Sequence, residues 1–130
     1  MLRNGAVYFV RSNGLPEATI QTKGGIRHIE EPNHMLATIP SILRPSINDM
    51  LVIGFGAGTI LESIPQQVKS IDVVELEPKM VEASRRVSGE RMRDPLTDDR
   101  VRIVFNDARG SLALTNKKWD VVISQPSHPW

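Results

Sequence analysis

The later part of the chain alternates short apolar runs with amphipathic stretches. Strand-length apolar runs are found at 50–53, 71–76, 101–105 and 121–124. Helical patterns lie between them, at 59–64, 78–87 and 108–114. Such alternation predicts a parallel sheet whose strands are connected by helices. The polar and charged segment 88–99 is predicted to be the loop that returns to the third strand.

The amino-terminal segment 1–31 has a different pattern, in which strand-type runs are separated by turn residues. Asn13-Gly14 and Gly24-Gly25 stand between the runs AVYFV, EATIQT and IRHI. Both dipeptides tolerate the positive φ angles that tight turns need. A small antiparallel β-hairpin segment is therefore predicted.

Segment 32–49 is predicted to be a connector. Asn33 could cap a short helix, 34–39, which Pro40 ends or kinks. The pattern thus divides the chain into the hairpin segment 1–31, the connector 32–49 and a partial parallel α/β domain, 50–130.

Composition and charge exclude several classes of function. The 16 Lys and Arg residues balance 15 Asp and Glu residues, so no strong field gathers nucleic acid or an anionic membrane. Arg85, Arg86, Arg91 and Arg93 are interleaved with acids and are expected on a solvated helix face. The absence of cysteine excludes disulfides and thiolate metal sites. No segment approaches the ~18 apolar residues of a membrane span, so a cytoplasmic protein is expected.

A glycine-rich turn follows the first strand of the predicted parallel sheet. The sequence LVIGFGAGT places Gly54, Gly56 and Gly58 between this strand and the next helix. Glycines let backbone N–H groups approach a ligand closely at a helix N-terminus. Thr59 stands where a dinucleotide-binding fingerprint has its third glycine, which favours an adenosyl cofactor over NAD. A tight turn that binds no ligand is the alternative.

Two acidic residues follow the next two strands. Glu75 closes the second strand, about 20 residues beyond the glycine turn, where a carboxylate can accept both ribose hydroxyls. The alternative is an exposed carboxylate at a strand end. Asp107 follows the third strand, and it could accept the adenine amino group, cap the helix that begins at Ala108, or do both.

These motifs occur in the order found in spermidine synthase-like proteins, which the chain resembles. The segments that carry the resemblance are LVIGFGAGT, DVVELEPKMVEASRRV, DPLTDDRVRIVFNDARGSL and KKWDVVISQPSHPW. The resemblance covers most of 37–130. It implies the Rossmann-like fold of the class I S-adenosylmethionine-dependent methyltransferase superfamily, with strand order 3-2-1-4.

The same resemblance implies a ligand and an activity. The ligand would be S-adenosylmethionine or decarboxylated S-adenosylmethionine, with methylthioadenosine as the product analogue and no metal ion. The activity would be transfer of an aminopropyl group to an amine. The glycines of the turn would line the methionine-derived part of the ligand, Glu75 the ribose, and Asp107 with Ala108 the adenine. The glycines that would line the methionine-derived part are Gly54, Gly56 and Gly58.

The sequence departs from the family where the catalytic acid is expected. Aminopropyl transfer needs an amine that has lost its proton, so the family places an acid after the fourth strand. Gln125 stands at this position, and an amide cannot take the proton. His128 stands near the position of a second acid and could act as a base. Pro32 and Asn33 replace the aromatic residue and the histidine that the polyamine enzymes offer their amine.

The family's sheet continues beyond the fourth strand, where this sequence ends. We expect either a truncated fragment or a small protein that completes its core by assembly. A homodimer could form through the edge strand at 121–124 or through the N-terminal hairpin, or a partner chain could complete the sheet. Two interpretations of function stay open: a transferase that binds an adenosyl cofactor, or a non-catalytic half-fold module for nucleoside binding or oligomeric assembly.

Overall fold

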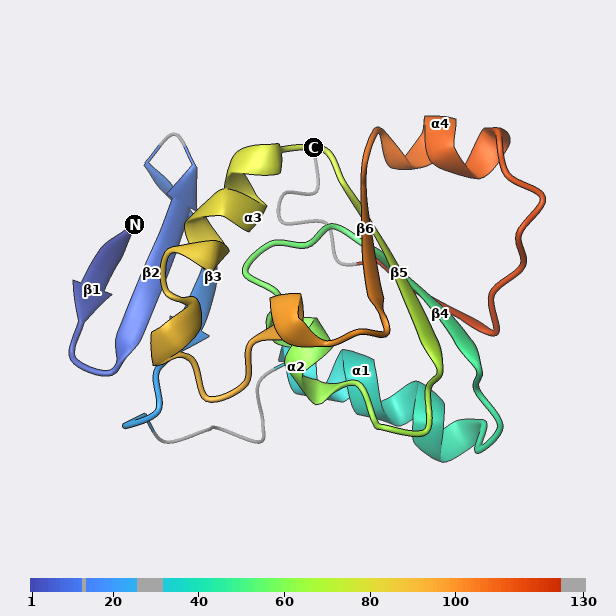
Figure 1. Ribbon diagram of the computed structural model, residues 1–130, viewed down its shortest axis with the longest axis horizontal. Helices are drawn as coiled ribbons and strands as arrows, with labels where there is room; N and C mark the ends of the chain where they lie inside the picture. Colours follow the sequence, from blue (N-terminus) through green and yellow to red (C-terminus); the bar gives the residue numbers. More distant parts are fainter. Residues whose placement is uncertain (13, 26–31, 125–130) are drawn as a thin grey trace.

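Two β-sheets lie side by side in the computed structural model, which describes residues 1–12, 14–25 and 32–124. Helix α3 lies between the two sheets (Figure 1). The first sheet is antiparallel and comes from the amino-terminal segment. The second is parallel and comes from the later part of the chain. The α/β class predicted from the sequence is confirmed.

The amino-terminal sheet has three strands in the order β1-β2-β3: β1 (Leu2–Asn4), β2 (Val7–Ser12) and β3 (Leu15–Gln21). Gly5 and Gly14 have φ angles of 58° and 82° in the turns between them. The predicted hairpin is therefore present. The sequence pattern missed β1, whose three residues are too few to make a recognisable run. The run IRHI lies outside the described residues.

Helix α1 (Pro32–Leu43) is longer than the predicted helix 34–39. Pro32 begins it. An N–H at the first helical position has no partner within the helix, so proline, which lacks this group, loses no hydrogen bond there. The helix continues through Pro40, whose carbonyl accepts the Arg44 N–H at 2.9 Å. Of the two effects expected at Pro40, an end or a kink, the end is wrong, and so is a cap at Asn33. Burial of one helical face, at His34, Ala37 and Ser41, outweighs the local effect of the proline.

The parallel sheet has the strand order β6-β5-β4-β7, which is the predicted order 3-2-1-4. Its strands are β4 (Asp49–Ile53), β5 (Ser70–Glu75), β6 (Val101–Phe105) and β7 (Val121–Ser124). The connecting helices are α2 (Thr59–Ser63), α3 (Pro78–Arg85) and α4 (Ala108–Ala113). Two short 3-10 turns, η1 (Ser88–Glu90) and η2 (Pro95–Thr97), lie in the predicted loop.

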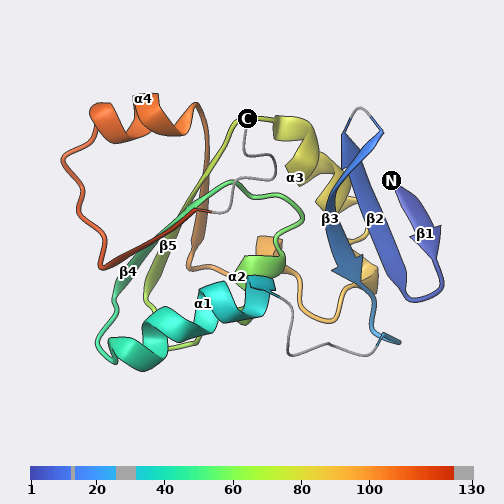
Figure 2. The same ribbon diagram turned by 180° about the vertical axis from the view of Figure 1, so that it is seen from behind.

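The main core lies between one face of the parallel sheet and helices α1 and α2 (Figure 2). Alternate residues of the strands point to this face, as a period of two requires. The buried residues of this core include Ala37, Met50, Val52, Leu61, Ile64, Ile71, Val73 and Ile123. Within the described residues, β7 pairs only with β4. Assembly through the other edge of β7, as a homodimer or with a partner chain, stays a prediction.

The four arginines between 85 and 93 do not share a solvated face. Arg85 and Arg86 are exposed, but Arg93 is half-buried and Arg91 is only 2% exposed. The expectation is therefore wrong for Arg91. Its burial depends on partners that are distant in the sequence, above all Glu62. The charges of neighbouring residues in the sequence do not reveal such partners.

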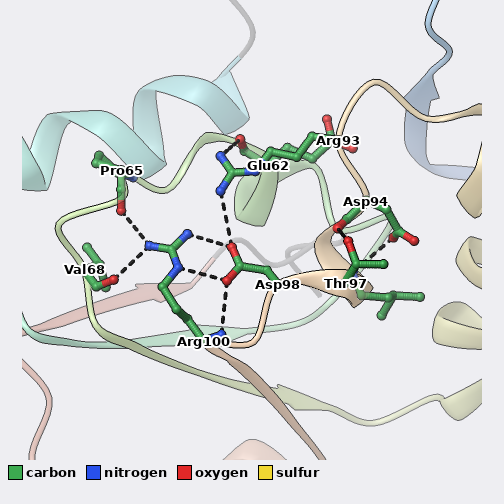
Figure 3. Close-up of polar contacts among 9 residues, drawn as sticks. Glu62, Pro65, Val68, Arg93, Asp94, Thr97, Asp98 and Arg100 are labelled. Atoms are coloured by element: carbon green, nitrogen blue, oxygen red, sulfur yellow. Dashed lines mark hydrogen bonds and ion pairs between the residues drawn. The ribbon is translucent and has the colours of Figure 1, made fainter.

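An ion-pair network around Asp98 fixes the loop that leads into β6 (Figure 3). Arg100 donates to both oxygens of the Asp98 carboxylate, at 2.9 and 2.7 Å, and also to the carbonyls of Pro65 and Val68. Arg93 lies 3.3 Å from the same carboxylate. The hydrogen bonds from Arg100, opposed by partial burial, lower the pKa of Asp98 to about 2.

Replacing Asp98 with Asn is expected to lower the free energy of unfolding by about 1 kcal/mol at pH 7, after allowance for solvent screening. Because the pKa is lowered in the folded state, this stabilisation is complete above the ordinary pKa of about 3.9 and is lost as the pH falls toward 2. Urea denaturation between pH 2 and 7 measures it. The exposed neighbour gives the matched control, Asp99→Asn, and an Asp98→Asn deficit that stays constant across this range would contradict the assignment.

Candidate functional site

A cavity of about 560 Å³ opens where the parallel strands end. Ile53, Glu75, Asn106 and Ser124, at or just beyond the carboxyl ends of β4, β5, β6 and β7, all line it. Open α/β sheets bind their ligands at this edge, because the loops that follow the strands converge there. The cavity is therefore the candidate site.

The glycine turn forms one wall of this cavity. Gly54, Gly56 and Gly58 have φ angles of 88°, 54° and 75°, a left-handed conformation that favours glycine. A Cβ atom at Gly54 or Gly56 would meet nothing within 4 Å, so at these positions the backbone lies open. A Cβ atom at Gly58 would lie 2.7 Å from Pro95 and 2.9 Å from Phe55. The third glycine thus allows close packing behind the turn.

Glu75 joins the end of β5 to the glycine turn. One carboxylate oxygen, Oε2, accepts the N–H of Phe55 at 2.7 Å and that of Gly56 at 3.3 Å, while Oε1 accepts the N–H of Glu77 at 2.8 Å. The residue is 7% exposed, so the alternative of an exposed strand-end carboxylate is wrong. The side chain points at the glycine turn. Its contact with a ribose stays a prediction.

Asp107 and Ala108 line the same cavity at the start of α4. Asp107 is the N-cap, and its carboxylate accepts the Gly110 N–H at 3.0 Å. The capping interpretation is thus confirmed, and the adenine contact stays a prediction. Sequence reasoning missed Asn106, which lines the cavity and accepts the Asp107 N–H at 2.8 Å. Its place after β6 was the signal that could have found it.

The amino-terminal part of the chain also contributes to the cavity. Ala18 of β3 and Asn33 of α1 line it, together with Met80 of α3. The Thr59 hydroxyl donates to the Thr19 carbonyl at 2.9 Å and so ties the start of α2 to β3. Sequence reasoning missed Ala18 and Met80, because their approach depends on how the two sheets pack.

Gln125 and His128, the residues at the expected catalytic positions, lie outside the described residues. Ser124, directly before Gln125, lines the cavity. His34 does not line it, and its ring is hydrogen-bonded to Ser63. Within 1–12, 14–25 and 32–124, no group of three or more acids and histidines could hold a metal ion. No helix in these same ranges is long and apolar enough to cross a membrane.

Comparison with known proteins gives one consistent family. The model of the spermine/spermidine synthase domain matches residues 31–130. Polyamine aminopropyltransferases are 30% identical over 93 residues in Methanocaldococcus jannaschii and 31% identical over 101 residues in Streptococcus uberis. These alignments cover 70% and 75% of this chain but only 31% and 35% of the relatives. The chain therefore spans about a third of the length of its curated relatives.

Solved structures show the same fold. A spermidine synthase in complex with the transition-state analogue AdoDATO has a TM-score of 0.70 and 23% identity, and the match covers 86% of this chain and 36% of that one. The spermidine synthase from Thermotoga maritima has the same score and identity, with 86% and 38% covered. The amino pentose methyltransferase CalS10, bound to S-adenosylmethionine, has a TM-score of 0.51 and 22% identity over 76% of this chain and 37% of its own.

Replacing Gly58 with Ala is expected to lower the free energy of unfolding by about 2 to 4 kcal/mol, because a left-handed conformation and a crowded Cβ both cost energy. Urea denaturation measures this loss. The matched control is Gly89→Ala, where a Cβ meets nothing within 4 Å. Equal stability of the two variants would show that the turn relaxes without cost.

Proposed function

This chain belongs to the spermine/spermidine synthase family, and on that basis we propose that it binds an S-adenosylmethionine-type nucleoside in the cavity beside the glycine turn. The ligand is S-adenosylmethionine or its decarboxylated form, with methylthioadenosine as the product analogue. Two similar structures support this class of ligand, since one holds AdoDATO and the other S-adenosylmethionine.

The observation that carries the proposal is the position of the Glu75 carboxylate, held against the glycine turn inside the cavity. A carboxylate has about four acceptor positions, and three backbone N–H groups use three of them here. The two hydroxyls of a ribose would take the fourth position and displace the longest bond, that from Gly56 at 3.3 Å. Glu75 would thus select a nucleoside with both hydroxyls.

The adenine is proposed to lie beside Asp107 and Ala108, at the end of β6. Asp107 caps α4 through one carboxylate oxygen, and a carboxylate with that single bond keeps further acceptor positions. It can therefore accept from the adenine amino group while it remains the helix cap. The open backbone at Gly54 and Gly56 leaves room for the methionine-derived part.

Catalysis by this chain is proposed to be weak or absent for polyamine substrates. Aminopropyl transfer requires that a base remove the proton from the attacking amine, and the neutral amide of Gln125 stands where the family has an acid. His128 is the remaining candidate base in that segment. Nucleoside binding without turnover, as in a non-catalytic module, is therefore the expected behaviour.

Replacing Glu75 with Gln is expected to weaken methylthioadenosine binding by about 1 to 3 kcal/mol, because ribose hydroxyls lose a charged acceptor. Isothermal titration calorimetry with methylthioadenosine, S-adenosylmethionine and its decarboxylated form measures this. The matched control is Glu82→Gln, at an exposed position of α3. If the parent protein binds none of the three ligands, the adenosyl proposal fails. Unchanged affinity of Glu75→Gln would show that Glu75 does not bind the ribose, but it would not contradict the adenosyl proposal.

An assay of aminopropyl transfer from decarboxylated S-adenosylmethionine to putrescine is expected to show no turnover. The variant Gln125→Asp restores a carboxylate at the family's position and tests whether that acid is what the chain lacks. Methylthioadenosine release, measured by chromatography, reports the reaction for both proteins. Appreciable turnover by the parent protein would show that Gln125 does not prevent catalysis.

A further inference from the structure

Arg91 lies buried directly behind the glycine turn. Its side chain has no exposed surface, and it does not line the cavity. Its Nη1 donates to the carbonyl of Ala57 at 2.7 Å and to the hydroxyl of Ser84. Its Nε and Nη2 donate to the Glu62 carboxylate of α2. One guanidinium therefore connects the turn to α2 and α3.

The bond to Ala57 holds one end of a peptide group in the turn. The peptide group between Ala57 and Gly58 is planar, so fixing its two ends fixes its orientation. Arg91 holds the carbonyl oxygen, and the Gly58 N–H donates to the Phe55 carbonyl at 2.7 Å. The glycines at 56 and 58 do not favour this conformation over others by themselves, because glycine is permissive. An outside contact is needed to select it.

The pairing of Arg91 explains why a charge can be buried here. A buried guanidinium is tolerated only when a counter-ion and hydrogen-bond acceptors surround it, and Glu62, Ser84 and Ala57 supply them. Arg93 contacts the same residue of α2, since it donates to the Glu62 carbonyl at 3.0 Å, and it also contacts Asp98 (Figure 3). Glu62 is thus held through both its side chain and its backbone carbonyl.

We infer that Arg91 is a positioning residue for the ligand-binding turn: through the Ala57 carbonyl it holds the turn in the conformation that meets Glu75 and admits the nucleoside. Arg91 does not touch the cavity, so any effect on the ligand passes through the turn. The effect on ligand affinity rests on the proposed function. The effect on the turn itself does not.

Hydrogen exchange of the ligand-free protein tests the inference with Arg91→Lys. Lysine keeps a positive charge near Glu62, but a single ammonium cannot reproduce the guanidinium fork that also reaches Ala57. The Gly58 amide is expected to exchange about tenfold faster, while the Val73 amide in β5 keeps its rate. Methylthioadenosine affinity is expected to fall about tenfold. The matched control Arg85→Lys, at an exposed arginine of α3, is expected to leave both quantities unchanged.

Two results would overturn the inference: an unchanged rate at Gly58, or equal acceleration at Gly58 and Val73, which would indicate a general loss of stability. If the parent protein binds no methylthioadenosine, the adenosyl proposal fails, and the exchange contrast still decides the role of Arg91. If Arg91→Lys does not fold, the double variant Glu62→Gln/Arg91→Gln removes both charges together. The same contrast between Gly58 and Val73 then applies to it.

Discussion

The carboxylate of Glu75 connects the two parts of the site, the end of a central strand and the glycine turn. It does so by accepting backbone N–H groups from Phe55 and Gly56, with only 7% of the residue exposed. Charged acceptors make stronger bonds than neutral ones, and low exposure limits competition from water. The turn is therefore oriented by the same side chain that is proposed to bind the ribose.

The opposite side of the turn has its own support. Arg91 holds the Ala57 carbonyl from within the protein, while Glu75 holds the amides of Phe55 and Gly56 on the cavity side. A glycine-rich turn has no side chains to separate its backbone from a ligand. Glycine also restricts the backbone conformation less than other residues do. Contacts on both of its sides replace that restraint without blocking the open backbone.

Sequence patterning predicted what depends on local periodicity. The parallel strands and the glycine turn followed from alternation of apolar runs, and the strand order followed from the family resemblance. What failed depends on distant packing: α1 continues through Pro40 because its buried face outweighs the proline, and Arg91 is buried because Glu62 faces it. The walls of the cavity at Ala18 and Met80 were missed for the same reason. Contact with a ligand stays predicted for the whole site.

A crystal structure of this chain with methylthioadenosine is the most direct measurement of the central claim. The account predicts that the ribose hydroxyls lie within hydrogen-bond distance of the Glu75 carboxylate and beside the open backbone of Gly54 and Gly56. A nucleoside bound elsewhere, or a Glu75 side chain turned away from the glycine turn in the complex, would contradict it.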